Sequence, residues 1–166
     1  MRERAQALLA SLGIDKPPVD VESIAESLDF LVLYFPFPDS QSGAMFIEGD
    51  TKTIGVNKWH AETRQRFTIA HELGHYLGGH EDFHALEKVS RSEGVPRWAD
   101  PEHQNEREAD IFAAELLMPE SMLREDVRTR EYDLDALAKR YGVSQQAMII
   151  QISDLGLVNA LRSVSR

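Results

Sequence analysis

The chain contains no cysteine, which excludes both disulfide bonds and a zinc site built from thiolates. Any metal ion would have to be held by histidine, aspartate or glutamate side chains. Basic residues are also scarce, because 18 lysines and arginines stand against 28 acidic residues and leave a net charge of −10. Non-specific binding to nucleic acid depends on neutralising phosphates, so this charge disfavours it.

Long apolar runs are absent as well, since no stretch approaches 18 residues, and no charged segment followed by an apolar one opens the chain. We therefore expect a soluble, cytoplasmic protein without a membrane partner. The 166 residues, 42% hydrophobic and 28% charged, have the composition of a globular protein and about the length of one domain.

The order of apolar patterns along the chain predicts an α+β fold. Strands are expected at 31–35, 42–48 and 52–57, the last two joined as a hairpin by Gly49-Asp50-Thr51. Helices are expected at 1–12, 21–28, 66–78, 105–118, 133–141 and 144–155. We expect a short antiparallel sheet of about three strands packed on these helices. The connection 79–104 has no sustained periodicity and is expected at the rim of the active site, with His80 and His84 as ordinary solvated residues.

The motif His71-Glu72-x-x-His75 lies inside the apolar helix predicted at 66–78. Residues four apart share one helix face, so the two imidazoles can hold one zinc ion at about 2.0–2.1 Å. Glu72 is rotated by about 100° from His71, which keeps it off the metal but near a metal-bound water. The sequence thus predicts one Zn²⁺ per chain, with His71 and His75 as ligands and Glu72 as the base that takes the proton of that water.

A catalytic zinc needs a third protein ligand, and the start of the helix predicted at 105–118 offers several carboxylates. We predict Glu106 as the ligand, with Asp110 four residues on accepting the free N–H of a zinc-bound histidine. Glu108 points to another side of the helix and remains the alternative. A metzincin-like continuation of the first motif would instead place the third ligand at Glu81, where that pattern has histidine.

Three further positions carry weaker signals. Tyr76 and His103 are considered as stabilisers of the transition state, although the position of Tyr76 is more typical of packing. Gly74 stands in mid-helix, where glycine is less favourable than alanine by about 0.8–1 kcal/mol. We therefore expect another backbone to approach the helix closely at this point.

Segments 67–75 and 106–119 together resemble the ImmA/IrrE family of bacterial zinc metallopeptidases. The closing Leu116-Leu117-Met118-Pro119, after an acidic and alanine-rich helix, is far more specific than His-Glu-x-x-His alone. Segment 137–144 also resembles the helical region that follows in such proteins. The resemblance spans roughly residues 31–158.

This resemblance implies a compact, gluzincin-like zinc metallo-endopeptidase, with the zinc at His71, His75 and a glutamate of the second motif. It also implies cleavage of a regulatory protein, in known members often a helix-turn-helix repressor, in stress responses or the control of mobile elements. We expect residues 1–130 to form the metallopeptidase domain and 131–166 a helical segment packed on it.

The competing hypothesis is a DNA- or partner-binding regulator with a structural or residual metal site. Its basis is residues 133–155, where a helix, a glycine-containing turn and a second helix have the spacing of a helix-turn-helix. The second helix offers glutamines but no arginine or lysine, on which base and phosphate contacts depend. Direct DNA binding is therefore not favoured.

Overall fold

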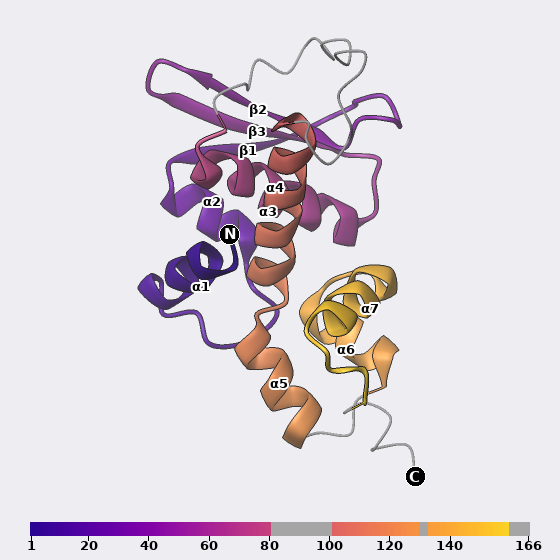
Figure 1. Cartoon of the computed structure of the whole chain (residues 1–166). Helices are drawn as coiled ribbons and strands as arrows, with labels where there is room; N and C mark the ends of the chain where they lie inside the picture. The colour runs from indigo at the N-terminus through magenta and orange to yellow at the C-terminus, as the bar shows by residue number, and fades with distance from the viewer. Residues whose placement is uncertain (81–100, 130–132, 160–166) are drawn as a thin grey trace.

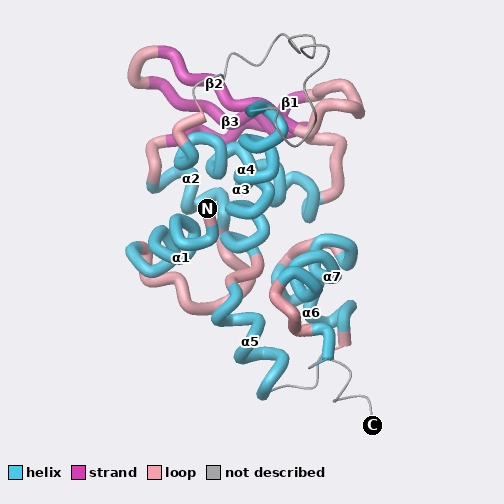
Figure 2. The backbone as a smooth tube through the Cα atoms, viewed as in Figure 1, coloured by secondary structure: helices cyan, strands magenta, loops and turns pink. Residues whose placement is uncertain are grey.

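The computed structural model describes residues 1–80, 101–129 and 133–159, which form a small sheet covered on one face by helices (Figures 1 and 2). The strands are β1 (Phe30–Phe35), β2 (Gly43–Glu48) and β3 (Thr51–Asn57). The helices are α1 (Arg2–Ser11), α2 (Val21–Ser27), α3 (Glu62–Gly78), α4 (Pro101–Leu117), α5 (Glu120–Thr129), α6 (Leu134–Tyr141) and α7 (Gln145–Asp154). The α+β class is confirmed. None of the described helices combines the length and apolarity needed to cross a bilayer.

The sheet has the strand order β1-β3-β2. β2 is antiparallel to β3, with Gly43 opposite Val56, so the predicted hairpin is confirmed. β1 runs parallel to β3, with Phe30 beside Lys52. The sheet is therefore mixed, which corrects the antiparallel sheet expected from the sequence. A tight turn at Gly49 encodes the hairpin locally, whereas β1 meets β3 only after a long connection, and no local pattern fixes its direction.

The buried face of the sheet packs on α3. Ile54 and Val56 of β3 and Ile69 and Leu73 of α3 are fully buried in one hydrophobic core. α3 ends where the sequence predicts, because Gly79 follows in the left-handed conformation with φ of 70°. The sheet thus fixes the position of the helix that carries the first motif.

α4 crosses α3 directly at Gly74 (Figure 1). A β-carbon added to Gly74 would lie 3.0 Å from both Cα and the carbonyl oxygen of Ala109. The expected close approach of a second backbone is confirmed. Gly74 lies between the motif histidines His71 and His75 in the sequence. The close contact at Gly74 therefore brings the second motif next to the first.

Three helices differ from the sequence prediction. α3 begins at Glu62 rather than at residue 66. α4 begins at Pro101 rather than near residue 105, and proline is well tolerated in a first turn because the N–H it lacks has no helical partner there. α5 was not predicted, since its sequence is mostly polar and the buried apolar residues described in it are only Leu123 and Val127, beside the buried carboxylate of Asp126. The spacing of these two residues, one helical turn apart, was the available signal.

The C-terminal helices α6 and α7 form the predicted pair and share the main core. Tyr141 and Met148 are fully buried in the same hydrophobic cluster as α3. Arg66 of α3 donates hydrogen bonds to the carbonyl oxygens of Val19, at 2.7 Å, and Gly142, at 3.0 Å. These contacts tie the turn between α6 and α7 to the motif helix.

Candidate metal centre

α3 presents the two motif histidines on one face, one helical turn apart. The Nε2 atoms of His71 and His75 lie 2.9 Å apart, and their rings are nearly perpendicular at 75°. The side chain of His75 is only 3% exposed, and that of His71 is 18% exposed. Two nitrogen lone pairs so close together favour a shared cation.

α4 brings Glu106 to both histidines. Its carboxylate oxygens lie 3.4 Å from Nε2 of His71 and 3.3 Å from Nε2 of His75. Ligands at about 2.0–2.1 Å from a tetrahedral zinc ion lie about 3.3 Å from one another. The three ligand atoms, all within 4.8 Å of one another, therefore fit a zinc ion and leave its fourth position open.

Outer hydrogen bonds hold the two imidazoles in place. Nδ1 of His71 lies 2.9 Å from Oδ1 of Asp110, the partner expected from the sequence. Nδ1 of His75 lies 3.1 Å from Nδ1 of His80, whose Nε2 is 3.4 Å from Glu108. With a cation held at Nε2, Nδ1 of each ring would carry the proton and donate it outward.

His80 and Glu108 thus form a second arm of the site. His80 is not the solvated residue expected, since its side chain is only 8% exposed. Sequence reasoning missed it because it follows the Gly79 helix stop, where no periodicity predicts the direction of a side chain. Glu108 lies 3.4 Å from Nε2 of His80 and does not join the cluster formed by Glu106.

The pKa values reflect this crowding of charges. Burial lowers the pKa of His71, but hydrogen bonds to Asp110 and Glu106 outweigh it and raise that pKa to about 10. Hydrogen bonds from His71 and His75 hold the pKa of Glu106 far below its ordinary value. Burial raises the pKa of Glu72 to about 7. These directions apply to the protein alone, and a cation bound to His71 would favour the neutral imidazole.

A cleft of about 530 Å³ opens over these residues and is lined by Glu72 and by the loop that leads into β2. Ser42, Gly43 and Ala44 form its wall on the sheet side. β2 is an edge strand of the described sheet, and its first two residues line this cleft. Arg64 of α3 donates to Oγ of Ser42 at 2.9 Å and joins the loop to the motif helix.

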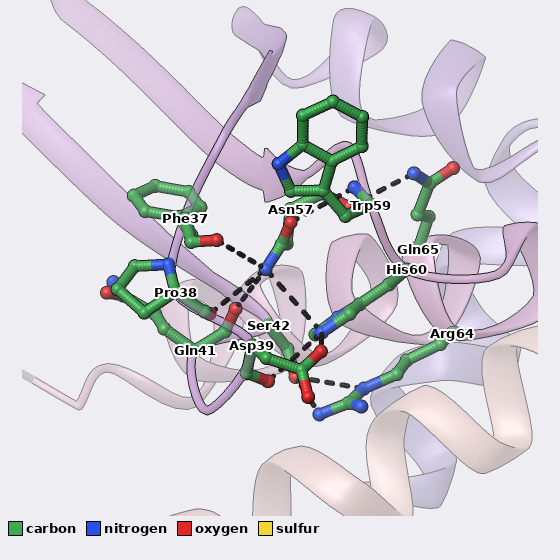
Figure 3. A network of polar contacts seen from close by, with 10 residues as sticks. All are labelled: Phe37, Pro38, Asp39, Gln41, Ser42, Asn57, Trp59, His60, Arg64 and Gln65. Atoms are coloured by element: carbon green, nitrogen blue, oxygen red, sulfur yellow. Dashed lines mark hydrogen bonds and ion pairs between the residues drawn. The ribbon is translucent and has the colours of Figure 1, made fainter.

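Asn57 at the end of β3 holds this loop in place (Figure 3). Its side-chain amide donates to the carbonyl oxygens of Phe37, Pro38 and Gln41 at 2.9–3.1 Å. Asn57 itself is fully buried. Sequence reasoning missed this role, because an asparagine after a strand is equally typical of an ordinary turn.

His60 completes the network around the loop. Its Nε2 lies 3.2 Å from the carbonyl oxygen of Asp39 and 3.5 Å from the Asn57 amide (Figure 3). Only 9% of the residue is exposed, and Nδ1 has no partner among the described residues. The loop before β2 is thus held by the side chains of Asn57 and His60, whereas Gly43 and Ala44 are held by the pairing of β2 with β3.

The remaining candidates lie elsewhere. The ring of Tyr76 packs edge-on against Phe30 at 4.9 Å, and its hydroxyl accepts from Nζ of Lys52 at 3.2 Å. Tyr76 therefore joins α3 to the sheet and is not among the residues that line the cleft. His103 is exposed in the first turn of α4 and is likewise not among them. Glu81 lies outside the described residues.

A helix with His-Glu-x-x-His, a crossing helix that adds a glutamate and a sheet edge beside them define a zincin-like metallopeptidase fold. The chain belongs to the M78 peptidase family, whose sequence profile, described as the IrrE N-terminal-like domain, matches residues 25–153. The resemblance to the ImmA/IrrE family is thereby confirmed. Membership of a metallopeptidase family implies a metal, and His71, His75 and Glu106 are the group that could hold it.

Two similar proteins place the chain further. It is 30% identical over 162 residues to the radiation response metalloprotease IrrE of Deinococcus deserti. This alignment covers 92% of the present chain and 53% of IrrE. The solved structure of a Mycobacterium tuberculosis transcriptional regulator matches 92% of this chain and 46% of that one, with a TM-score of 0.65. At 21% identity the second likeness concerns the fold alone. The chain spans about half the length of these relatives.

Proposed function

We propose that this chain is a zinc-dependent endopeptidase. The observation that carries the proposal is the convergence of His71, His75 and Glu106 within 4.8 Å, beside the buried carboxylate of Glu72. Two imidazoles and one carboxylate are the ligand set of catalytic zinc sites that keep a fourth position open. The absence of cysteine agrees with this set and excludes a thiolate site.

The chemistry divides between the metal and the chain. A zinc ion held there would supply a Lewis acid and lower the pKa of a bound water to about 7. Glu72 lines the cleft and is placed to accept a proton from water and to return it to the leaving amine. Asp110 and His80 keep the His71 and His75 rings oriented.

The peptide substrate binds along β2. An extended segment can add to a sheet edge by main-chain hydrogen bonds, and the edge at Gly43 and Ala44 lines the metal cleft. Arg64 and Asn57 hold the preceding loop from two sides, which keeps this edge ready for a substrate. The preorganised edge reduces the entropy lost on binding.

The substrate is a regulatory protein, and a helix-turn-helix repressor is the class that the family resemblance favours. The role of the chain in stress response is supported by its likeness to a radiation response metalloprotease. The alternative, a DNA- or partner-binding regulator, has less support because α7 contains neither arginine nor lysine.

The test uses the zinc-loaded protein and the transcriptional regulator encoded beside its gene. We expect one specific cut, located by mass spectrometry. Glu72→Gln should retain zinc and fold but lose about 10²–10⁴-fold of the rate, since glutamine cannot accept the proton of the water. Unchanged hydrolysis in this variant, or retardation of DNA at physiological salt without any proteolysis, would contradict the proposal.

A further inference from the structure

A second hollow, of about 760 Å³, lies between α7 and the crossing helices α3 and α4. It shares Arg64, Phe67 and Asp110 with the metal cleft, so the two hollows adjoin. We refer to the part between α4 and α7 as the α4–α7 groove.

The α4–α7 groove is lined by regular helix faces. Ile111 and Ala114 lie one turn apart on α4, and Ala147 and Ile150 oppose them from α7. The alanines keep the space between the helices open, because a larger side chain at either position would project into it. The hollow also has polar lining residues, among them Arg2, Arg107 and Gln146, but the facing side chains of α4 and α7 are apolar, and its size suits a ligand side chain.

α7 exposes apolar surface where a DNA-reading helix would carry cationic side chains. Ile149 is 51% exposed and Ile150 is 53% exposed, and the helix has no arginine or lysine. Only Ile150 of this pair lines the groove. The surface is therefore suited to another polypeptide and not to a phosphate backbone.

We propose that the α4–α7 groove is a substrate subsite that takes a large apolar side chain from the segment beside the scissile bond. The lining residues that the groove shares with the metal cleft assign this occupant, and the inference rests on the proposed endopeptidase function. Ile150 and Ile111 then determine specificity, and neither belongs to the machinery that acts on the peptide bond. Sequences with leucine, isoleucine, methionine or phenylalanine at one fixed distance from the cut are preferred.

The test compares Ile150→Asp with Ile149→Asp, a matched control on the adjacent and equally exposed isoleucine. The probe is a peptide library derived from a digested bacterial proteome, incubated with each zinc-loaded protein and analysed by mass spectrometry. The wild type and Ile149→Asp should share an apolar preference at one position. Ile150→Asp should lose it by about tenfold or more, since apolar pockets discriminate to this extent, and should gain lysine or arginine there. General damage to the fold would not produce such an inversion.

A second arm repeats the comparison by capture of the same library on zinc-loaded Glu72→Gln protein. Cleavage by the wild type with a preference that Ile150→Asp leaves unchanged would overturn the subsite and leave the endopeptidase standing. If the Glu72→Gln protein captured apolar peptides that the wild type never cut, the result would support the groove and overturn the proposed function. No apolar preference in either arm would overturn the subsite. A wild-type dimer that Ile150→Asp converts to monomer in sedimentation would also overturn it and assign the groove to a second copy of the chain.

Discussion

Replacing Gly74 by alanine should separate the two halves of the metal centre. The added methyl group would meet Cα and the carbonyl oxygen of Ala109 at 3.0 Å and Cβ of Phe112 at 3.2 Å. The first two atoms are helix backbone and cannot move without the helix. α4, and with it Glu106 and Asp110, must therefore shift away from α3 by a few tenths of an ångström.

The stability change is the difference of two opposing effects. Alanine is favoured over glycine within a helix by about 0.8–1 kcal/mol. Overpacking of a well-filled interface costs about 1–3 kcal/mol. We therefore expect Gly74→Ala to destabilise the protein by up to about 2 kcal/mol in guanidinium unfolding. The effect on zinc should be larger in proportion, on the order of tenfold in affinity, because ligand distances tolerate only about 0.2 Å.

The control is Gly13→Ala, in the turn after α1. Gly13 has φ of 66° and no atom within 4 Å of an added β-carbon, so alanine there strains the backbone without pressing on any helix. It should lower stability by about 1–2 kcal/mol and leave zinc affinity, measured by chelator competition, unchanged. If Gly74→Ala were more stable by the full helix propensity and bound zinc as the wild type does, the close crossing would be refuted.

Three further results are expected. Glu106→Ala should weaken zinc binding much more than Glu108→Ala, and Asp110→Asn should weaken it by about 10–100-fold. Competition with a chelator measures all three affinities, and a stronger effect at position 108 would reassign the third ligand. Asn57→Ala should reduce the free energy of unfolding by about 1–3 kcal/mol, because three carbonyl oxygens of the cleft loop lose their donor. An unchanged free energy of unfolding would show that water replaces the Asn57 amide as donor. Asp20→Ala should cost about 1 kcal/mol at pH 7 through loss of the α2 cap, whereas Asp20→Asn should cost little. Hydrogen bonds to the first turn lower the pKa of Asp20 in the folded protein, so the part of its contribution that depends on the charge is present above the unfolded value of about 3.9 and is lost as the pH falls through the folded value. A cost of Asp20→Ala that did not decrease on acidification would contradict this assignment.

Local patterns predicted those parts of the molecule that local chemistry specifies. The spacing of His71 and His75, the glycine stop at Gly79 and the hairpin at Gly49 each depend on a few neighbouring residues. The unusual glycine at position 74 even indicated a contact that only the fold completes. The convergence of Glu106 with the histidines followed from the ligand count that zinc requires, not from any pattern in α4.

The parts that escaped prediction depend on distant partners. Asn57 binds carbonyl oxygens 16 to 20 residues earlier, and His80 pairs with Glu108 from the crossing helix. β1 pairs directly with β3, although β2 lies between them in the sequence, and this pairing sets the parallel direction of β1. Neither residue type nor periodicity encodes such contacts, because each becomes favourable only when the rest of the fold is in place.

The second motif has a structural end as well as a metal-binding one. Glu115, nine residues after Glu106, is fully buried and accepts hydrogen bonds from Arg2 and Gln6 of α1 and from Gln151 of α7. It also accepts the backbone N–H of Glu120 at the start of α5, so one carboxylate joins four helices. Because the Arg2 side chain is 32% exposed, loss of Glu115 should cost less than the roughly 3–5 kcal/mol of a fully buried ion pair. A substitution at Glu115 that abolished activity would therefore report on the assembly of α4 with its neighbours, whereas one at Glu106 would report on the metal.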